Sequence, residues 1–256
     1  MTTSFSLAKR LRAGETIHTA WCGLASPLAA ETLARVGFPA VTLDNQHGLF
    51  DFSTTAAGIA SVHLAGAAPV VRVPLADFAS ASRMLDLGAE AVIAPLVNTP
   101  ADARAFAASM KFPPVGERSW GPHRAIALSG LDEKTYLREA NAMTIALAMI
   151  ETRDALKNLD AILEVPGIDG IFIGPSDLSI ALSDGAVIDP HSTAVDGSLD
   201  LVAATATRAK KIAGAYCANA DRALALERRG FRFLAVASDA VFLRNGASAA
   251  LKVLKG

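Results

Sequence analysis

The sequence predicts a single (β/α)8 barrel domain that spans residues 1–256. Short apolar runs rich in β-branched residues alternate along the whole chain with longer Ala/Leu-rich stretches of helical spacing. No linker, low-complexity segment or change of composition divides the chain, and eight such units suit one closed barrel of this length. An open doubly wound sheet is the alternative architecture.

The predicted strands are nearly continuous apolar runs, which is what a parallel strand covered on both faces needs. They are Thr16–Cys22, Ala40–Leu43, Pro69–Val73, Ala91–Leu96, Thr144–Ile150, Gly170–Ile173, Ile212–Tyr216 and Phe231–Val236. The uncharged run Phe52–Val71 is long enough to span a membrane, but its polar, Gly and Pro residues favour a helix, a turn and a strand.

Helical spacing between the strands predicts helices that end near Gly or Pro residues. These helices are Pro27–Val36, Ala76–Leu87, Pro100–Met110, Arg153–Leu163 and Asp221–Arg229. Two segments do not fit a minimal barrel and are expected as long loops, Lys111–Ala142 and Ser183–Ser198. Long loops in compact domains are commonly functional.

The charge balance restricts the class of partner. The chain has 24 basic and 25 acidic residues without a basic block, so neither nucleic acid nor a membrane surface is expected as a partner. Cys22 and Cys217 form no disulfide framework and no metal-ligand spacing, and Met1–Leu11 lacks the apolar stretch of a secretory signal. We therefore expect a cytoplasmic protein that binds a small molecule or another protein.

Ionisable residues follow several predicted strands at their carboxyl ends. Asp44 ends the second strand, Arg72 the third and Glu151 the fifth, and Asp177 follows the sixth. Taken singly, each has a structural explanation, as a helix cap, a rim ion pair or a first-turn acid. Together they need a common cause, because active sites of such barrels lie at this end, the mouth of the barrel.

The residue types at the mouth indicate enolate or carboxylate chemistry. Glu151 and Asp177, without soft ligands nearby, outline a site for a hard cation such as Mg²⁺ or Mn²⁺. Arg72 offers a planar donor fork for a carboxylate or an enolate oxygen. His47 is the histidine expected at the mouth as the base, with His123 of the long loop as a candidate accessory group.

Two other mechanisms lack the residues that they need. Schiff-base catalysis requires a lysine at a strand's carboxyl end, whereas the lysines lie in helices, loops or termini, or precede the seventh strand. The segment after the seventh strand, residues 215–219, has no glycine that would let backbone amides approach a phosphate. We therefore expect a substrate without a phosphate group.

These residues resemble the metal-dependent class II pyruvate aldolases of the HpcH/HpaI type, which include 4-hydroxy-2-oxoheptanedioate and 2-dehydro-3-deoxyglucarate aldolases. The most specific stretch runs from Glu151 through Asn158 to Gly167–Ser179 and resembles the family's metal-binding signature. Supporting matches are Leu43–His47, Val70–Pro74 and Phe112–Arg118, so the resemblance covers nearly the whole chain.

The resemblance implies a barrel of the phosphoenolpyruvate/pyruvate-binding type that cleaves or forms 4-hydroxy-2-keto acids from pyruvate and an aldehyde. It implies a divalent cation, Mg²⁺, Mn²⁺ or Co²⁺, and an oligomer, a hexamer formed as a trimer of dimers that exchange their C-terminal helices at Ala247–Leu254. By the same resemblance, Glu151 and Asp177 hold the metal, His47 is the acid/base with Asp86 as its orienting partner, and Arg72 stabilises the enolate, with Asp44 in the same polar cluster. The expected substrate-binding residues are Gly174, Pro175, Ser176, Asp177, Arg72, Trp21, Phe172, Tyr216 and Trp120.

The sequence departs from the family pattern in two places. Asn45-Gln46 precedes the histidine where an acid-bearing pair is usual, and Ser119-Trp120 places a large aromatic residue in the loop that reaches a neighbouring subunit's acceptor pocket. The alternatives are an oxaloacetate decarboxylase, a lyase of the citrate-lyase β type and a barrel without catalytic activity. The citrate-lyase type should show a basic patch for coenzyme A, and the sequence has none that is evident.

Overall fold

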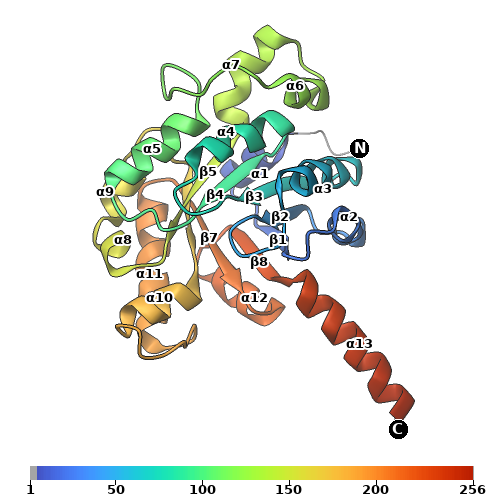
Figure 1. The fold of residues 1–256 in the computed structure, drawn as a ribbon. Coiled ribbons are helices and arrows are strands. Elements are labelled where there is room, and N and C mark those ends of the chain that lie inside the picture. The colour runs from blue at the N-terminus through green and yellow to red at the C-terminus, as the bar shows by residue number, and fades with distance from the viewer. Residues whose placement is uncertain (1–4, 256) are drawn as a thin grey trace.

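The computed structural model describes residues 5–255 and contains a closed barrel of eight parallel strands in chain order. The strands are β1 Ile17–Cys22, β2 Ala40–Asp44, β3 Ala68–Arg72, β4 Ala91–Ala94, β5 Ile145–Ile150, β6 Gly170–Ile173, β7 Ile212–Cys217 and β8 Phe233–Ser238. Figure 1 shows the helices arranged around these strands. The predicted (β/α)8 barrel is thus confirmed, and the open sheet is excluded because β8 pairs with β1.

The helices between the strands match most of the predicted ones. The helices are α1 Leu7–Arg12, α2 Pro27–Val36, α3 Phe52–Leu64, α4 Phe78–Leu87, α5 Pro100–Met110, α6 His123–Ser129, α7 Glu133–Met143, α8 Arg153–Lys157, α9 Leu159–Leu163, α10 Pro175–Leu182, α11 Thr193–Arg208, α12 Ala220–Arg228 and α13 Asp239–Lys255. Within residues 5–255 no helix combines the length and the apolarity needed to cross a bilayer.

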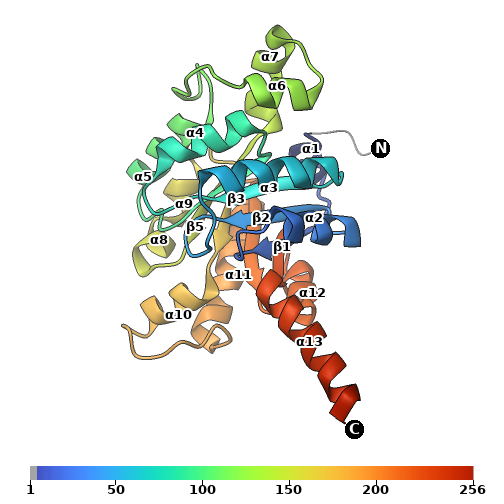
Figure 2. The same ribbon diagram turned by 45° about the vertical axis from the view of Figure 1, so that its right-hand side comes forward.

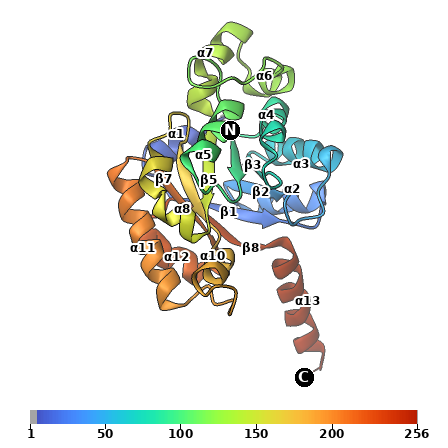
Figure 3. The ribbon, with the colours of Figure 1, turned by 60° about the vertical axis from the view of Figure 1, so that its left-hand side comes forward.

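Most predicted strands and helices differ from the structure by one or two residues at a boundary, and the expected loop Ser183–Ser198 includes the first residues of α11, from Thr193. Three differences are informative. The fourth strand ends at Ala94 because Pro95 has no N–H to donate and Leu96 adopts a φ of 51°. The predicted helix Arg153–Leu163 is broken at Asn158, whose side-chain amide donates to the carbonyl of Asn98 at 2.8 Å. The segment Lys111–Ala142, expected as a loop, contains α6 and most of α7, which lie together beyond α4 in Figure 3.

The barrel has an apolar interior and a second apolar layer between strands and helices. Along β5, Leu147 and Met149 belong to the interior cluster, whereas Ala146 and Ala148 belong to the outer cluster. Because side chains alternate along a strand, the residue two positions beyond Met149 continues on the inward face. This periodicity directs Glu151 toward the barrel mouth.

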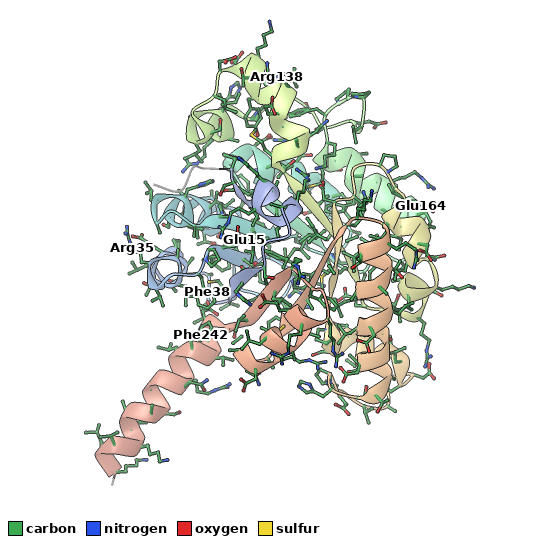
Figure 4. All side chains as sticks on the ribbon, turned by 180° about the vertical axis from the view of Figure 1, so that it is seen from behind. Glu15, Arg35, Phe38, Arg138, Glu164 and Phe242 are labelled. Atoms are coloured by element: carbon green, nitrogen blue, oxygen red, sulfur yellow. The ribbon has the colours of Figure 1, made fainter. Side chains whose placement is uncertain are left out.

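The last helix, α13, projects from the barrel, as Figures 1 and 2 show. At its base the ring of Phe242 lies 5.8 Å from that of Phe38, and the two residues are neighbours in Figure 4. Asp239 begins the helix and accepts hydrogen bonds from the amides of Gly23 and Leu24 at 2.9–3.1 Å. Farther along, Leu243, Leu251 and Leu254 are 68%, 51% and 82% exposed.

Both cysteines are free and buried in strands on opposite sides of β8. Cys22 is the last residue of β1 and Cys217 the last residue of β7. Burial raises the pKa of each thiol well above its ordinary value. Neither thiol is therefore in the ionised form that reacts readily.

Candidate active site

A cavity of about 260 Å³ opens at the carboxyl ends of the strands. Nine predicted site residues line it together with Met149, namely Trp21, His47, Arg72, Phe172, Gly174, Pro175, Ser176, Asp177 and Tyr216. Trp21, Arg72, Phe172 and Tyr216 lie in the strands β1, β3, β6 and β7. His47 lies in the segment that follows β2, and residues 174–177 form the start of α10. The structure therefore brings together at the mouth most of the side chains that the sequence predicted there.

Asp44 and Arg72 form a buried ion pair on the inner wall of the cavity. The two residues are opposite each other in the register of β2 and β3. Arg72 Nε donates to Asp44 Oδ1 at 2.8 Å and Nη2 donates to Oδ2 at 2.7 Å. This two-point contact fixes the plane of the guanidinium and leaves Nη1 for a ligand.

Trp21 holds the same pair from β1. The guanidinium carbon of Arg72 lies 4.9 Å from the centre of the Trp21 ring, and Trp21 Nε1 donates to Asp44 Oδ2 at 3.2 Å. Burial opposes ionisation of Asp44, but the hydrogen bonds and the charge of Arg72 outweigh it and lower the pKa of Asp44. The carboxylate thus stays ionised and keeps Arg72 in place at neutral pH.

The same carboxylate shapes the segment that carries His47. Asp44 Oδ1 accepts hydrogen bonds from the backbone amides of Gln46 at 3.1 Å and His47 at 3.3 Å. The His47 side chain is exposed and lines the cavity. Gln46, the residue before His47, has a buried Oε1 without a hydrogen-bond partner among the described residues.

Glu151 is the second buried carboxylate of the site. Its Oε1 accepts a hydrogen bond from the amide of Leu96 at 2.8 Å, and the left-handed conformation of Leu96 presents that amide. Its Oε2 is buried with no hydrogen-bond partner in the described part of the chain. Burial, followed by the nearby charge of Asp177, raises the pKa of Glu151 to about 7.

The residues present fit a divalent cation. An unpaired buried carboxylate oxygen is costly, and a cation removes both the unpaired acceptor and the burial penalty. Asp177 influences the pKa of Glu151, so the two carboxylates share one electrostatic environment. No cluster of three acidic, His or Cys side chains forms a metal site within residues 5–255, so two carboxylates would hold the ion and leave positions for substrate and water.

The start of α10 forms another wall of the cavity. Gly174 caps this helix without a side-chain hydrogen bond, Pro175 is its first residue and Asp177 lies in its first turn. The amides of Ser176 and Asp177 have no acceptor among the described backbone hydrogen bonds. Free amides at a helix N-terminus attract anions such as a carboxylate.

Three residues considered in the sequence lie elsewhere in the single chain. Asp86, on α4, accepts a hydrogen bond from Arg118 at 2.6 Å, and within residues 5–255 it forms no hydrogen bond or ion pair with His47. Trp120 packs near Phe112 with ring centres 5.6 Å apart and does not line the cavity. His123, expected in a loop, is the first residue of α6.

Two residues of the site, Met149 and Leu96, were not predicted from the sequence. Met149 lines the cavity because it is on the inward face of β5, and the alternation that ends in Glu151 could have identified it. Leu96 contributes only its amide, whose direction depends on a positive φ. No residue type at that position signals such a conformation.

The chain matches a known family and several characterised proteins. The family model described as HpcH/HpaI aldolase/citrate lyase matches residues 18–246. A hydroxypyruvate/pyruvate aldolase from Rhizorhabdus wittichii is 39% identical over 87% of this chain and 88% of that protein. A 4-hydroxy-2-oxo-heptane-1,7-dioate aldolase from Klebsiella pneumoniae is 34% identical over 93% of this chain and 89% of that protein. The crystal structure of a family protein from Burkholderia cenocepacia matches with a TM-score of 0.90 at 29% identity and covers 99% of this chain and 100% of that chain.

Gly174→Ala should disable the site although it adds only a methyl group. A Cβ at this position would lie 2.4 Å from Glu151 Oε2, so the carboxylate must move. We expect turnover to fall by at least about tenfold, which corresponds to about 1.4 kcal/mol. Steady-state kinetics over a range of metal concentrations measure the effect.

The matched control is Gly197→Ala in α11, where a Cβ would meet no atom within 4 Å. This variant should keep full turnover, and the melting temperature should not fall because Ala favours a helix more than Gly. Unchanged kinetics in Gly174→Ala would contradict the close approach of Glu151.

Proposed function

The chain belongs to the HpcH/HpaI aldolase/citrate lyase family, and from this premise we propose how its barrel mouth catalyses the aldol reaction. The protein is a carbon–carbon lyase, a class II pyruvate aldolase. We expect it to cleave 4-hydroxy-2-keto acids to pyruvate and an aldehyde, and to catalyse the reverse reaction that joins the two. The observation that carries the proposal is that one cavity combines the unpaired Glu151 oxygen, the oriented Arg72 and the uncapped start of α10.

The mouth binds the keto-acid end of the substrate. The backbone amides of Ser176 and Asp177 donate hydrogen bonds to the substrate carboxylate at the start of α10. Trp21, Phe172 and Tyr216 form an aromatic wall in which Trp21 lies 5.8 Å from Phe172 and 5.7 Å from Tyr216 between ring centres. This wall excludes water and strengthens the electrostatic interactions in the cavity.

Glu151 and Asp177 would hold the divalent cation, for which Mg²⁺, Mn²⁺ and Co²⁺ are the candidates. When bound, the cation supplies Lewis-acid stabilisation of negative charge on the 2-keto oxygen of the substrate. Arg72 lines the same cavity, and its Nη1, which is not used in the contact with Asp44, donates to the oxygen on which this charge develops. Asp44 keeps the guanidinium in the required orientation.

His47 moves the proton in the cleavage direction. It takes the proton of the 4-hydroxyl, directly or through a water molecule, as the bond between C3 and C4 breaks. The electron pair of that bond becomes the pyruvate enolate, and the hydroxyl carbon becomes the aldehyde. Return of that proton from His47, directly or through water, to C3 of the enolate then yields pyruvate and restores the base. Asp86 remains the predicted orienting partner of His47.

The central test measures pyruvate release from a 4-hydroxy-2-keto acid before and after removal of metal. Activity should disappear in a chelator and return with Mg²⁺, Mn²⁺ or Co²⁺, because the two carboxylates need the ion that they hold. Glu151→Gln and Asp177→Asn should stay inactive after metal is restored, whereas the exposed acid variant Asp184→Asn should behave as the unchanged protein. Full turnover in the metal-free protein would refute the assignment.

Replacement of His47 should separate two reactions that share an enolate. His47→Ala should reduce aldol cleavage by about 100-fold or more, the usual share of general acid–base catalysis. Decarboxylation of oxaloacetate, the expected side activity, requires no proton from a hydroxyl and should decline much less. A coupled pyruvate assay follows both rates in one preparation, and equal losses would show that His47 acts on the fold or on metal binding.

We further propose that α13 is exchanged between subunits of a homo-oligomer, a trimer of dimers. Leu243, Ala247, Ala250 and Leu254 recur at helical spacing, and all four are exposed in the single chain. The two free cysteines suit a reducing compartment, and we place the oligomer in the cytoplasm.

Light scattering at micromolar concentration should give about six times the chain mass of 26.5 kDa. Leu243→Glu should shift the protein to smaller species, because it places a charge on the apolar stripe of α13. Asn245→Glu, on the opposite side of the same helix, is the matched control and should leave the mass unchanged. A monomer for the unchanged protein would contradict the proposal.

A further inference from the structure

A second cleft, of about 610 Å³, lies at the opposite end of the barrel from the mouth. Its walls include Asp169 before β6, Ile212 at the start of β7 and Arg232 before β8. These positions lie at the amino ends of β6, β7 and β8, whereas the active-site cavity lies at the carboxyl ends of the strands. The cleft is therefore separate from the aldol site.

The lining of this cleft carries an excess of positive charge. Four of its described residues are cationic, Arg12, Lys210, Lys211 and Arg232, and one is acidic, Asp169. The chain as a whole has a net charge of −1, so the local excess is a property of this cleft. A concave surface of one sign of charge attracts counter-ions more strongly than an exposed one.

Asp169, the one carboxylate that lines the cleft among the described residues, is already paired with two cations. Asp169 Oδ1 accepts from Arg12 Nη2 at 2.8 Å, and Oδ2 accepts from Lys111 Nζ at 2.7 Å. Lys111 is 2% exposed and lies behind the cleft wall, where it adds a buried positive charge. Asp169 therefore cannot compensate the remaining cations of the cleft.

Those remaining cations have no carboxylate partner within residues 5–255. Lys211 Nζ donates to the carbonyl of Ile168 at 2.5 Å, and Arg232 Nη1 donates to the carbonyls of Phe231 and Glu227 at 2.9 and 3.0 Å. Lys210 has no side-chain partner in the same part of the chain. Of the nearby carboxylates, Glu15 pairs with Arg10, and Glu227 Oε2 lies 3.6 Å from His18 Nε2 and forms no ion pair with Arg232 or the two lysines within residues 5–255.

We propose that this cleft binds a small, multiply charged anion, a phosphate ester or a polycarboxylate, at a site distinct from the aldol centre. Lys210 and Arg232 contact the anion directly, and the backbone amides of the lining contribute little because Lys210, Ile212 and Arg232 already donate theirs to protein carbonyls. Recognition by side-chain cations alone suits a ligand with two or more negative charges.

The test is isothermal titration of the intact protein with glycerol 2-phosphate and, separately, with tricarballylate. Mg²⁺ and pyruvate are present throughout so that the mouth is occupied, and sodium chloride of equal ionic strength serves as the blank. At least one anion should bind, and the better of the two identifies the chemical class. Arg72→Ala, at the mouth, should leave this affinity unchanged.

Lys210→Glu should weaken binding by about tenfold, because an attraction becomes a repulsion at close range. Lys210→Met, which only removes the charge, should weaken binding less. Lys157→Glu, at an exposed helix end away from the cleft, makes the same charge change and should have no effect. Without the anion, the aldol rate of Lys210→Glu should equal that of the unchanged protein, which shows that the barrel is intact.

Three results would overturn the proposal. The first is the absence of binding beyond the salt blank for both anions. The second is equal affinity in the unchanged protein and Lys210→Glu. The third is loss of binding in Arg72→Ala, which would place the anion in the mouth.

Discussion

The ion pair between Asp44 and Arg72 is the interaction on which the geometry of the mouth depends. A buried ion pair contributes little net stability, because desolvation of both charges offsets their attraction. Its effect here is orientation: Asp44 also accepts from Trp21 and from the amides of Gln46 and His47. One carboxylate thereby positions Arg72, which we propose stabilises the enolate, together with Trp21 of the aromatic wall and the segment that carries the proposed base. Because the pKa of Asp44 is lowered, the carboxylate stays ionised and keeps these groups in place at neutral pH. This orientation is lost only as the pH falls through the lowered pKa of Asp44.

Strand periodicity explains why much of the site was predictable from the sequence. A polar residue that ends an apolar parallel strand must lie at the barrel mouth, which identified Asp44, Arg72 and Glu151. The pairing of Asp44 with Arg72 follows from the register between two strands, which the order of residues does not reveal. The positive φ of Leu96 and the break at Asn158 also depend on tertiary contacts. The Pro- and Gly-rich start of the segment Lys111–Ala142 obscured the two helices that follow it.

The two ends of the barrel use charge in different ways. At the mouth, one Glu151 oxygen has no hydrogen-bond partner within residues 5–255, an arrangement that is unfavourable until a cation or proton binds. At the amino ends of the strands, Lys111 is buried but donates to three acceptors, the carbonyls of Asn141 and Thr144 and the carboxylate of Asp169. Such a satisfied network rigidifies the base of the barrel. The Lys111 network lies at the amino ends of β5 and β6, and Glu151 and Asp177 follow the carboxyl ends of the same two strands. The rigid network therefore supports the strands that position the two carboxylates.

The burial of both cysteines has a practical consequence for spectroscopy. A thiol introduced on the surface would ionise near its ordinary pKa, whereas Cys22 and Cys217 have raised pKa values and no exposed surface. Maleimide dyes and nitroxide spin labels should therefore attach selectively to the new cysteine without removal of the native ones. One label on α13 and one on the barrel would then report the distance between the helix and a barrel. That barrel is the one in the same chain or the one in a neighbouring chain, and Cys22 and Cys217 stay in place during the measurement.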